Sequence, residues 1–170
     1  MAAVTAGHVV ISPFTVLVDS REQAPYAFES IPATGIHQYV VPTRVVGIPS
    51  GDYSIDGMQH LIAIERKSLE DLYGTLGAGR ERFEREVERL NEMQFAAIVI
   101  EADVRELWRP SEFRSQWVSQ LNPRSVEGTV IAWSIRWPHV HWWTMGSRRA
   151  AELRTFATLK RFWEERQKTD

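Results

Sequence analysis

The feature of the sequence that most constrains the fold is an unbroken apolar run at Phe95–Ile100, Phe-Ala-Ala-Ile-Val-Ile. A run of strand length with no polar residue on either face is typical of a strand covered on both sides, at the centre of a sheet. The segment before it supports this arrangement. Residues 80–93 carry Phe83, Val87 and Leu90 at helical spacing among charged residues, which predicts an amphipathic helix. We therefore expect strands that alternate with helices.

Further strands and helices are expected before and after this run. Upstream we expect a strand at 14–18, a loop at 20–37, a β-rich stretch at 39–46 that Pro42 interrupts, and a hairpin of strands at 53–55 and 60–65. Ser68 is expected to cap a short helix, and downstream the sequence predicts a helix at 123–137, a strand at 140–143 and a helix at 147–167. Strands with interleaved helices predict one α/β domain over residues 14–170, preceded by an extension over residues 1–13.

Composition removes several classes of site. The chain has no cysteine, which excludes disulfides, thiolate zinc sites and cysteine nucleophiles. It has no apolar stretch of about 18 residues, so no membrane-spanning helix is expected, and residues 1–13 lack the features of a signal peptide. We therefore expect a soluble, cytoplasmic protein with no membrane partner, associated with the nucleoid in a bacterium or phage and with the nucleus in a eukaryote.

Acidic residues stand where the expected strands end. Asp19 and Glu65 each end an apolar strand, and Asp52 lies in a turn. A hairpin joining residues 52–55 to 61–65 would bring Asp52 and Glu65 together at one end of the sheet. Two neighbouring carboxylates repel each other, so such a pair usually holds a divalent cation. Oxygen ligands without Cys or His favour Mg²⁺, for which Mn²⁺ can substitute.

Lys67 lies two residues after Glu65 and hence on the same face of the strand. There it would orient or deprotonate a metal-bound water and stabilise the negative charge that develops when a phosphodiester is attacked. Taken singly, these residues have plainer explanations. Asp52 is explained as a turn residue, and Glu65 as the partner of Arg66 in a simple salt bridge.

Four clusters follow one another along the chain: Asp19-Ser-Arg21-Glu22, Gly51-Asp52-Tyr53, Glu65-Arg66-Lys67 followed by Asp71, and Arg80, Phe83 and Glu84 on a helix before an apolar strand. An acid followed by Glu-X-Lys matches the PD-(D/E)XK nuclease signature, and the full set closely resembles the XPF-family nuclease domain. The resemblance covers residues 14–103 clearly and the rest in outline. It implies an α/β, restriction-endonuclease-like three-layer fold, in which a central mixed β-sheet is flanked by helices.

The resemblance also implies roles for individual residues. Asp52 and Glu65 would bind the metal directly, with the backbone carbonyl of Arg66 as a third ligand. Asp19 would be an additional acid on the metal or its water, and Lys67 the water-activating or charge-stabilising residue. Arg21 and Arg66 would hold phosphates or brace the carboxylates. The remaining residues expected to support the site or to contact DNA are Glu22, Asp71 and Arg80.

The function that this resemblance implies is that of a Mg²⁺-dependent endodeoxyribonuclease. It would hydrolyse phosphodiester bonds in flap, fork or junction DNA, where single and double strands meet, during DNA repair or recombination. Two alternatives remain open. One is a catalytically inactive XPF-like subunit that binds DNA or a partner chain, against which the intact Asp52, Glu65 and Lys67 argue. The other is a different PD-(D/E)XK enzyme, such as a junction resolvase or a restriction-type endonuclease.

Charge is divided unevenly along the chain. The formal net charge is −2, but residues 1–103 hold 8 Lys and Arg against 15 Asp and Glu, whereas residues 104–170 hold 12 against 7. An acidic half that gathers cations and a basic half that faces phosphates are compatible with a metal-dependent nuclease. Chance unevenness over solvated helix faces explains the same numbers equally well.

The partner expected besides DNA is a second copy or another chain. Many XPF-family proteins carry a tandem helix-hairpin-helix module after the nuclease domain, and this sequence ends at Asp170 without one. Either the module was lost, or another chain supplies it, or DNA binding rests on the basic residues after 104. We expect pairing through the C-terminal helices, where large anchoring side chains are abundant: Val126, Val130, Trp133, Trp137, Leu153, Phe156, Leu159, Phe162 and Trp163. The alternative is that these side chains close the core.

Overall fold

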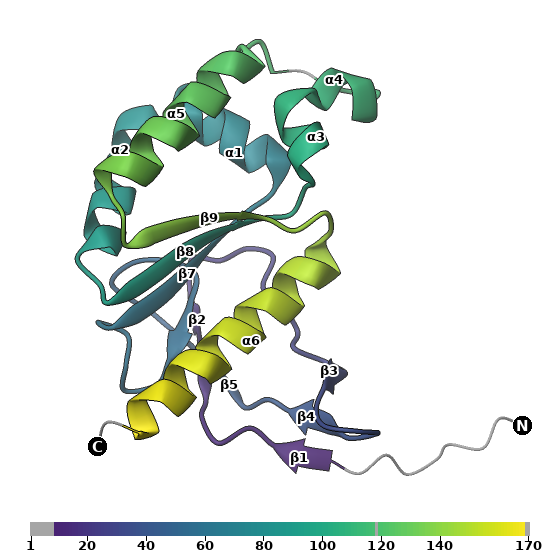
Figure 1. Cartoon of the computed structure of the whole chain (residues 1–170), viewed down its shortest axis with the longest axis vertical. Coiled ribbons are helices and arrows are strands. Elements are labelled where there is room, and N and C mark those ends of the chain that lie inside the picture. Colours follow the sequence, from purple (N-terminus) through teal and green to yellow (C-terminus); the bar gives the residue numbers. More distant parts are fainter. Residues whose placement is uncertain (1–8, 118, 169–170) are drawn as a thin grey trace, which may run out of the picture.

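The structure, a computed structural model, describes residues 9–117 and 119–168. A six-stranded sheet of order β5-β2-β6-β7-β8-β9 lies between two layers of helices (Figure 1). Strand β6 runs antiparallel to both of its neighbours, and the other neighbouring pairs are parallel. The strands are β2 (Val16–Asp19), β5 (Thr43–Val46), β6 (Tyr53–Ile55), β7 (Ile62–Lys67), β8 (Phe95–Ile100) and β9 (Val140–Thr144). A mixed sheet flanked by helices is the predicted fold.

The two helical layers differ in size. One face of the sheet packs against α1 (Leu69–Leu76), α2 (Arg80–Asn91) and α5 (Pro123–Arg136), with the short α3 (Val104–Trp108) and α4 (Pro110–Phe113) beside them. The other face packs against the long α6 (Arg148–Gln167), which crosses the sheet in Figure 1. A second, three-stranded sheet of order β1-β4-β3 contains β1 (Val9–Ile11), β4 (Gln38–Val40) and β3 (Ile31–Pro32).

Alternation along β7 assigns each of its side chains to one layer. Ala63 belongs to the core under α1, α2 and α5, whereas Ile62 and Ile64 belong to the core under α6. Because successive side chains of a strand point to opposite faces, Glu65 and Lys67 lie on the α1–α2 side. Arg66 lies on the opposite side, toward α6.

Helix α1 follows directly on β7 because Ser68 caps it. The Ser68 side chain accepts a hydrogen bond from the Asp71 N–H, which satisfies one of the free donors at the start of the helix. Helix α1 ends at Gly77, and α2 begins three residues later at Arg80. This short connection keeps both helices over the C-terminal end of β7, where Glu65 and Lys67 lie.

Most predicted elements are present, with shifted ends. The return strand of the hairpin begins at Ile62 rather than His60 and continues to Lys67, because residues 56–61 form the connection and Gly57 takes a φ of +81°. The hairpin nevertheless has the predicted pairing of its two strands, with Tyr53 opposite Ile64. The elements that were not predicted are β1, β3, α3 and α4. Strand β1 lies within the expected N-terminal extension and pairs in parallel with β4.

The C-terminal aromatic and aliphatic residues close the core. Trp133 is 1% exposed, and Val126, Val130, Trp137, Phe156 and Leu159 are also buried. Leu153, Phe162 and Trp163 are partly buried and pack against the α6 core. The expectation that these side chains provide surplus apolar surface is therefore wrong, because a sheet covered on both faces needs both helical layers.

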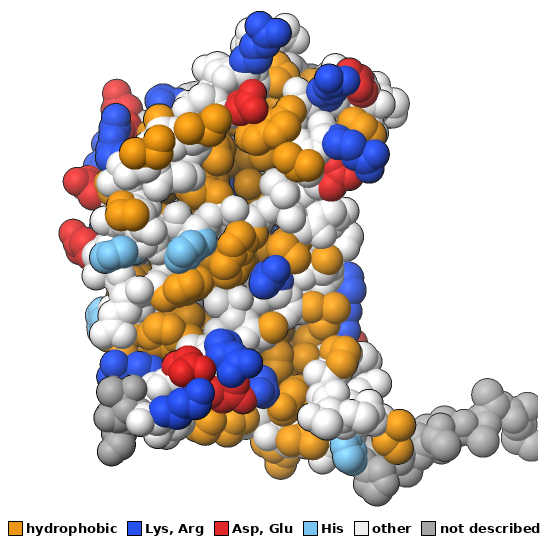
Figure 2. Space-filling model, viewed as in Figure 1, with side chains coloured by type: hydrophobic (Ala, Val, Ile, Leu, Met, Phe, Trp, Pro, Cys, Tyr) orange, Lys and Arg blue, Asp and Glu red, His pale blue; other side chains and the backbone are white. Residues whose placement is uncertain are grey.

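The outer surface of α5 carries different apolar residues. Ile131 and Ile135, one helical turn apart, are 54% and 77% exposed. Figure 2, in the view of Figure 1, shows hydrophobic side chains over α5 and β9 and a cluster of basic and acidic side chains at the C-terminal end of α6. Within the described residues, no helix is both long and apolar enough to cross a membrane.

Candidate active site

Asp52 is fixed by its backbone between two strands. Its N–H donates to the Ile64 carbonyl of β7 at 2.9 Å, and its carbonyl accepts from the Asp19 N–H of β2 at 2.8 Å. The preceding residue, Gly51, has a φ of +77°, and a Cβ there would lie 2.9 Å from the Cβ of Ala63. Only glycine fits this close approach without strain. The turn that carries Asp52 is therefore built against β7.

The Asp52 carboxylate meets the end of β7. Its Oδ2 accepts a hydrogen bond from the backbone N–H of Arg66 at 2.7 Å. In a strand, the N–H and the C=O of one residue point to the same edge. The Arg66 carbonyl therefore lies on the edge of β7 that faces Asp52, as a third oxygen ligand would have to.

Glu65 and Lys67 lie together on the face of β7 toward α2. Lys67 Nζ is 2.6 Å from Glu65 Oε1 and 4.7 Å from the ring centroid of Phe83. The Glu65 residue is only 8% exposed. The side chains thus share one face, as the alternation predicts, and the plainer explanation of Glu65 as the partner of Arg66 is wrong.

Burial and mutual repulsion make this corner unfavourable for two negative charges. Burial, with the charge of Glu65, raises the pKa of Asp52 to about 8. Burial also raises the pKa of Glu65, although the neighbouring Lys67 opposes the shift. For Lys67, burial disfavours the ammonium, but Glu65 and, more weakly, Asp52 and Asp71 outweigh it and hold its pKa above the ordinary value. A cation between the two carboxylates would relieve the repulsion.

The donor set suits a hard divalent cation. Asp52 and Glu65 offer carboxylate oxygens, and the Arg66 carbonyl lies on the same side as Asp52. In the part of the chain that the structure describes, no three His, Asp or Glu side chains form a ready metal cluster. A cation here would use the two carboxylates with backbone oxygen and water, which is how proteins commonly hold Mg²⁺.

Asp19 is occupied by contacts within the protein. Its Oδ1 accepts from the Arg21 N–H at 2.8 Å and from Arg21 Nε at 2.7 Å, and its Oδ2 accepts from the Ile48 N–H at 2.9 Å. Burial raises the pKa of Asp19, but the Arg21 and backbone hydrogen bonds outweigh it and lower the pKa. Asp19 and Arg21 therefore brace the loops beside Asp52, and a role for Asp19 on the metal stays a prediction.

The Arg66 side chain braces the opposite face of the sheet. It forks to Glu101, with Nε–Oε1 at 2.8 Å and Nη2–Oε2 at 3.1 Å, and it lies 3.5 Å from Glu22. Only 11% of the side chain is exposed. Of the two roles expected for this guanidinium, the contacts support bracing the carboxylates. Glu101, which follows β8, was not predicted to belong to the site, because its partner lies 35 residues away.

Asp71 borders the cleft, whereas the side chain of Arg80 contacts α5. Asp71 is exposed on the first turn of α1 and lines the cleft beside Lys67. Arg80 points toward α5: its Nη1 donates to Thr129 Oγ1 at 2.9 Å, and its guanidinium lies 5.2 Å from the ring centroid of Trp133. The contacts of Arg80 thus support helix packing rather than the cleft.

These residues border one continuous cleft. A cavity of about 450 Å³ lies between Asp19, Arg21, Asp52, Glu65 and Lys67 on the sheet side and Thr75, Arg82, Phe83, Glu86 and Arg89 on the helical side. An adjoining cavity of about 420 Å³ shares Asp52, Glu65 and Lys67 and is also lined by Glu22, Gln23, Ser68 and Asp71. Arg82, Glu86 and Arg89 were predicted only as part of an amphipathic helix, with no role at the site. The sequence feature that could have identified them is the spacing of residues 82, 86 and 89, which places them on one side of the helix.

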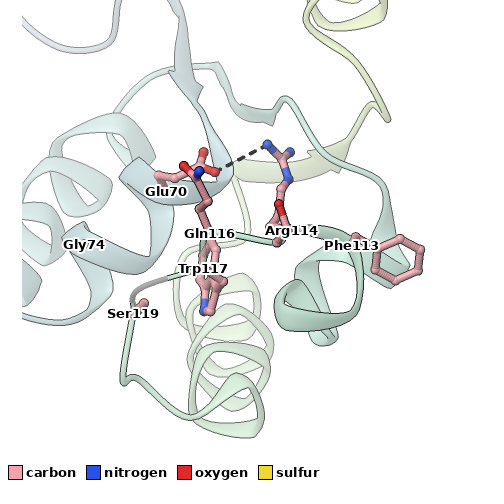
Figure 3. Close-up of a pocket in the computed structure, with 8 residues that line it drawn as sticks. Glu70, Gly74, Phe113, Arg114, Gln116, Trp117 and Ser119 are labelled. Atoms are coloured by element: carbon pink, nitrogen blue, oxygen red, sulfur yellow. Dashed lines mark hydrogen bonds and ion pairs between the residues drawn. The ribbon is translucent and has the colours of Figure 1, made fainter.

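A separate cavity of about 520 Å³ lies between α1 and residues 113–117 and 119. Figure 3 shows Glu70, Arg114 and Trp117 around it, with Arg114 Nη1 3.4 Å from Glu70 Oε1. Trp117 packs edge-on against Tyr73 at a centroid distance of 4.7 Å. Since Glu70 precedes Asp71 on α1, this cavity lies beside the cleft, but it belongs to a surface of mixed charge.

Comparisons with known proteins agree with this geometry. The family model described as the ERCC4 domain matches residues 18–153, a stretch that includes every residue predicted for the site. Among solved structures, the chain is similar to XPF from Aeropyrum pernix, with a TM-score of 0.63 and 21% identity over 91% of this chain and 67% of that chain. A second similar structure is XPF from Aeropyrum pernix in complex with DNA, with a TM-score of 0.61 and 20% identity over 89% of this chain and 66% of that chain. No curated protein sequence gives a match. The likeness confirms the predicted fold, and the chain spans about two thirds of the length of these structures.

Proposed function

This chain belongs to the ERCC4 domain family, and from that membership we propose that it is a divalent-metal-dependent DNA endonuclease that selects its substrates by structure. The observation that carries the proposal is the meeting of Asp52, Glu65 and Lys67 in one corner of a cleft. There the pKa of each carboxylate is raised by burial and by neighbouring charge. Shifts of this kind, produced by burial and specific charge partners in a cleft, are characteristic of functional sites.

Asp52, Glu65 and the Arg66 carbonyl would hold the metal, which is proposed to be Mg²⁺ with Mn²⁺ as a substitute. When bound, it would polarise a phosphoryl oxygen and lower the pKa of a water. Lys67, whose pKa Glu65 holds above its ordinary value, carries its proton at neutral pH. It would therefore act first as a cation that orients the attacking water and stabilises the charge on the phosphate. The water oxygen bonds to phosphorus as the P–O bond to the leaving sugar oxygen breaks, and a proton of the water ends on that oxygen, so the products carry a phosphate and a hydroxyl end.

The charges around the cleft suit a phosphodiester once a metal is bound. The cavity of about 450 Å³ is lined by four acidic residues, Asp19, Asp52, Glu65 and Glu86, and by four basic residues, Arg21, Lys67, Arg82 and Arg89, so its formal charges balance. A divalent cation would leave the cleft positive, which favours a polyanion. Arg21, 71% exposed at its side chain, lies at the rim where a phosphate can reach it.

The proposed substrate is DNA in which single and double strands meet, as in flap, fork or junction DNA, and the proposed setting is DNA repair or recombination. Two observations support DNA as the substrate class: the family membership, and the similarity to an XPF structure that is a complex with DNA. An inactive DNA-binding subunit is the alternative. The intact metal-ligand set and the raised pKa values of its acids favour an enzyme instead.

We also propose that the chain pairs with a second copy or a partner chain, through residues other than the C-terminal side chains that the sequence suggested. Trp133, Trp137 and Phe156 are buried and Phe162 and Trp163 are partly buried in the core, so the exposed Ile131 and Ile135 of α5 would carry the contact. Sedimentation at micromolar concentration tests this proposal. A mass of 19.6 kDa for the free protein at every concentration, together with one chain per DNA molecule in the complex, would exclude self-association.

A cleavage panel tests the proposed function. Flap, splayed-arm, four-way-junction and plain duplex DNA are incubated with wild type, Asp52→Asn and Glu65→Gln in Mg²⁺, Mn²⁺ or EDTA. We expect wild type to cut branched DNA in either metal and both variants to bind DNA without cutting. Cleavage in EDTA, or by either variant at the wild-type rate, would reject the mechanism. Binding without cleavage by wild type would select the inactive subunit, and cutting of the four-way junction alone would select a resolvase.

A further inference from the structure

Helix α2 contacts the turn that carries Asp52. Glu86 Oε1 accepts a hydrogen bond from the Gly51 N–H at 3.1 Å, and Arg89 Nε donates to Ser50 Oγ at 3.2 Å. The second carboxylate oxygen of Glu86 pairs with Arg89, three residues along the same helix. Two side chains of α2, tied to each other, are therefore also tied to two consecutive residues of the turn.

The turn depends on these contacts. Gly51 is buried, and a buried N–H without an acceptor is strongly destabilising, so its bond to Glu86 satisfies a donor that needs a partner. Ser50 is 2% exposed, and its hydroxyl is the group that Arg89 reaches. Gly51 already lies in a left-handed conformation in tight contact with Ala63. A small movement of this turn would move Asp52, the next residue.

The same two side chains line the cleft. Glu86 and Arg89 border the cavity that Asp52, Glu65 and Lys67 also border. Val87, between them on the helix, is fully buried in the core, and Phe83, three residues before Glu86, packs under Lys67. The helix is thus anchored by its apolar face while its polar face reaches the turn. This gives α2 a rigid position from which to hold Ser50 and Gly51.

We propose that Glu86 and Arg89 are positioning residues of the active site: by holding the Ser50–Gly51 turn from α2, they place the Asp52 carboxylate beside Glu65 for metal binding. The inference rests on the proposed function, which it deepens by adding α2 to the metal-binding arrangement. Glu86 acts as a hydrogen-bond acceptor and not as a metal ligand, so a neutral acceptor in its place should suffice.

The test compares three variants on one helix. Glu86→Ala removes the acceptor, Glu86→Gln keeps a carbonyl oxygen for the Gly51 N–H, and Glu88→Ala removes an exposed carboxylate as the matched control. Mn²⁺ binding to the DNA-free protein is followed by electron paramagnetic resonance, and the exchange rate of the Gly51 amide by NMR. Because one hydrogen bond is lost, we expect Glu86→Ala to weaken Mn²⁺ binding by about five- to ten-fold. Its Gly51 amide should exchange faster than in wild type. The Mn²⁺ affinity and the Gly51 exchange rate of Glu86→Gln and Glu88→Ala should stay within about two-fold of wild type, a smaller change than the loss of one hydrogen bond causes.

Each outcome decides the proposal independently of cleavage. If Glu86→Gln binds Mn²⁺ as weakly as Glu86→Ala, the carboxylate acts by its charge and the positioning role is rejected. If the Gly51 amide of Glu86→Ala exchanges as in wild type, the contact does not hold the turn. Should Glu86→Ala fail to fold, Ser50→Ala, which removes only the hydroxyl that Arg89 reaches, takes its place with the same readouts. A wild type that binds Mn²⁺ but cuts no DNA would reject the proposed nuclease and leave this inference standing.

Discussion

The backbone N–H of Arg66 donates to the carboxylate of Asp52 at 2.7 Å. The strand that carries Glu65 and Lys67 therefore also fixes Asp52, the acid that immediately precedes the neighbouring strand β6. Because the bond lies between a main-chain donor and a side-chain acceptor, it depends on the register of β6 against β7 and not on the identity of residue 66. The two proposed metal-binding carboxylates are thus positioned by one hairpin.

Replacing Asp52 by Asn should abolish cleavage and raise the thermal stability of the metal-free protein. The folded pKa of Asp52, about 8, lies above that of an exposed aspartate. The group therefore contributes most stability below the unfolded pKa and loses it as pH rises through the folded value. We expect Tm in EDTA to fall between pH 5 and 9 for wild type and to fall less for Asp52→Asn. Parallel Tm curves for the two proteins would contradict the buried, charge-repelled state of Asp52.

Metal binding should release protons. Since the pKa of Asp52 is about 8 and that of Glu65 is also raised, the site holds a proton at neutral pH that a cation must displace. For a single displaced proton, affinity should rise about ten-fold per pH unit below pH 8 and level off above it. Calorimetry with Mn²⁺ in buffers of different ionisation enthalpy measures the released protons directly. An affinity independent of pH from 6 to 8 would show that both acids are already charged.

Lys67→Ala should lower the cleavage rate on the order of 10²-fold at saturating metal, because a group that orients water and stabilises charge is lost. Metal affinity should change little, since Lys67 contacts Glu65 through Nζ and offers no ligand itself. Single-turnover cleavage over a range of Mg²⁺ concentrations separates the two effects. A normal rate at high Mg²⁺ with much weaker metal binding would instead assign Lys67 the role of holding Glu65.

Gly51→Ala and Gly57→Ala form a matched pair. Both positions have positive φ, +77° and +81°, so both alanines are strained by about 1–2 kcal/mol. Only at residue 51 does the new Cβ meet another atom, the Ala63 Cβ at 2.9 Å, whereas nothing lies within 4 Å of a Cβ at residue 57. We expect Gly51→Ala to be the less stable variant in urea unfolding and to lose cleavage, while Gly57→Ala keeps it. Equal losses in both would show that the close approach at β7 does not matter.

The sheet side of the site could be predicted because its geometry is local. Glu65 and Lys67 share a face by the two-residue period of a strand, and Asp52 reaches them through a hairpin whose turn and strands are evident in the sequence. The contacts with α2 could not be predicted in the same way. Glu86 reaches Gly51 across 35 residues, and nothing in its own segment distinguishes it from the exposed Glu88.

Arg80 and the C-terminal aromatics show a second limit of sequence reasoning. Arg80 was expected to support the site or to contact DNA, but its guanidinium packs on Trp133 and donates to Thr129, two residues of α5 that lie about 50 positions away in the sequence. Trp133 and Phe156 were expected at a partner surface, yet each fills one side of the sheet. Amphipathic periodicity identifies a buried face without identifying what buries it.

The alternation of β7 makes the active site sensitive to folding errors of a particular kind. A slip of one residue between β6 and β7 would exchange the faces of Glu65 and Arg66 and place charged groups in the wrong layer. Such a molecule would lack the carboxylate pair and would bury a guanidinium away from Glu101. Chain that folds in the wrong register would therefore be both unstable and inactive.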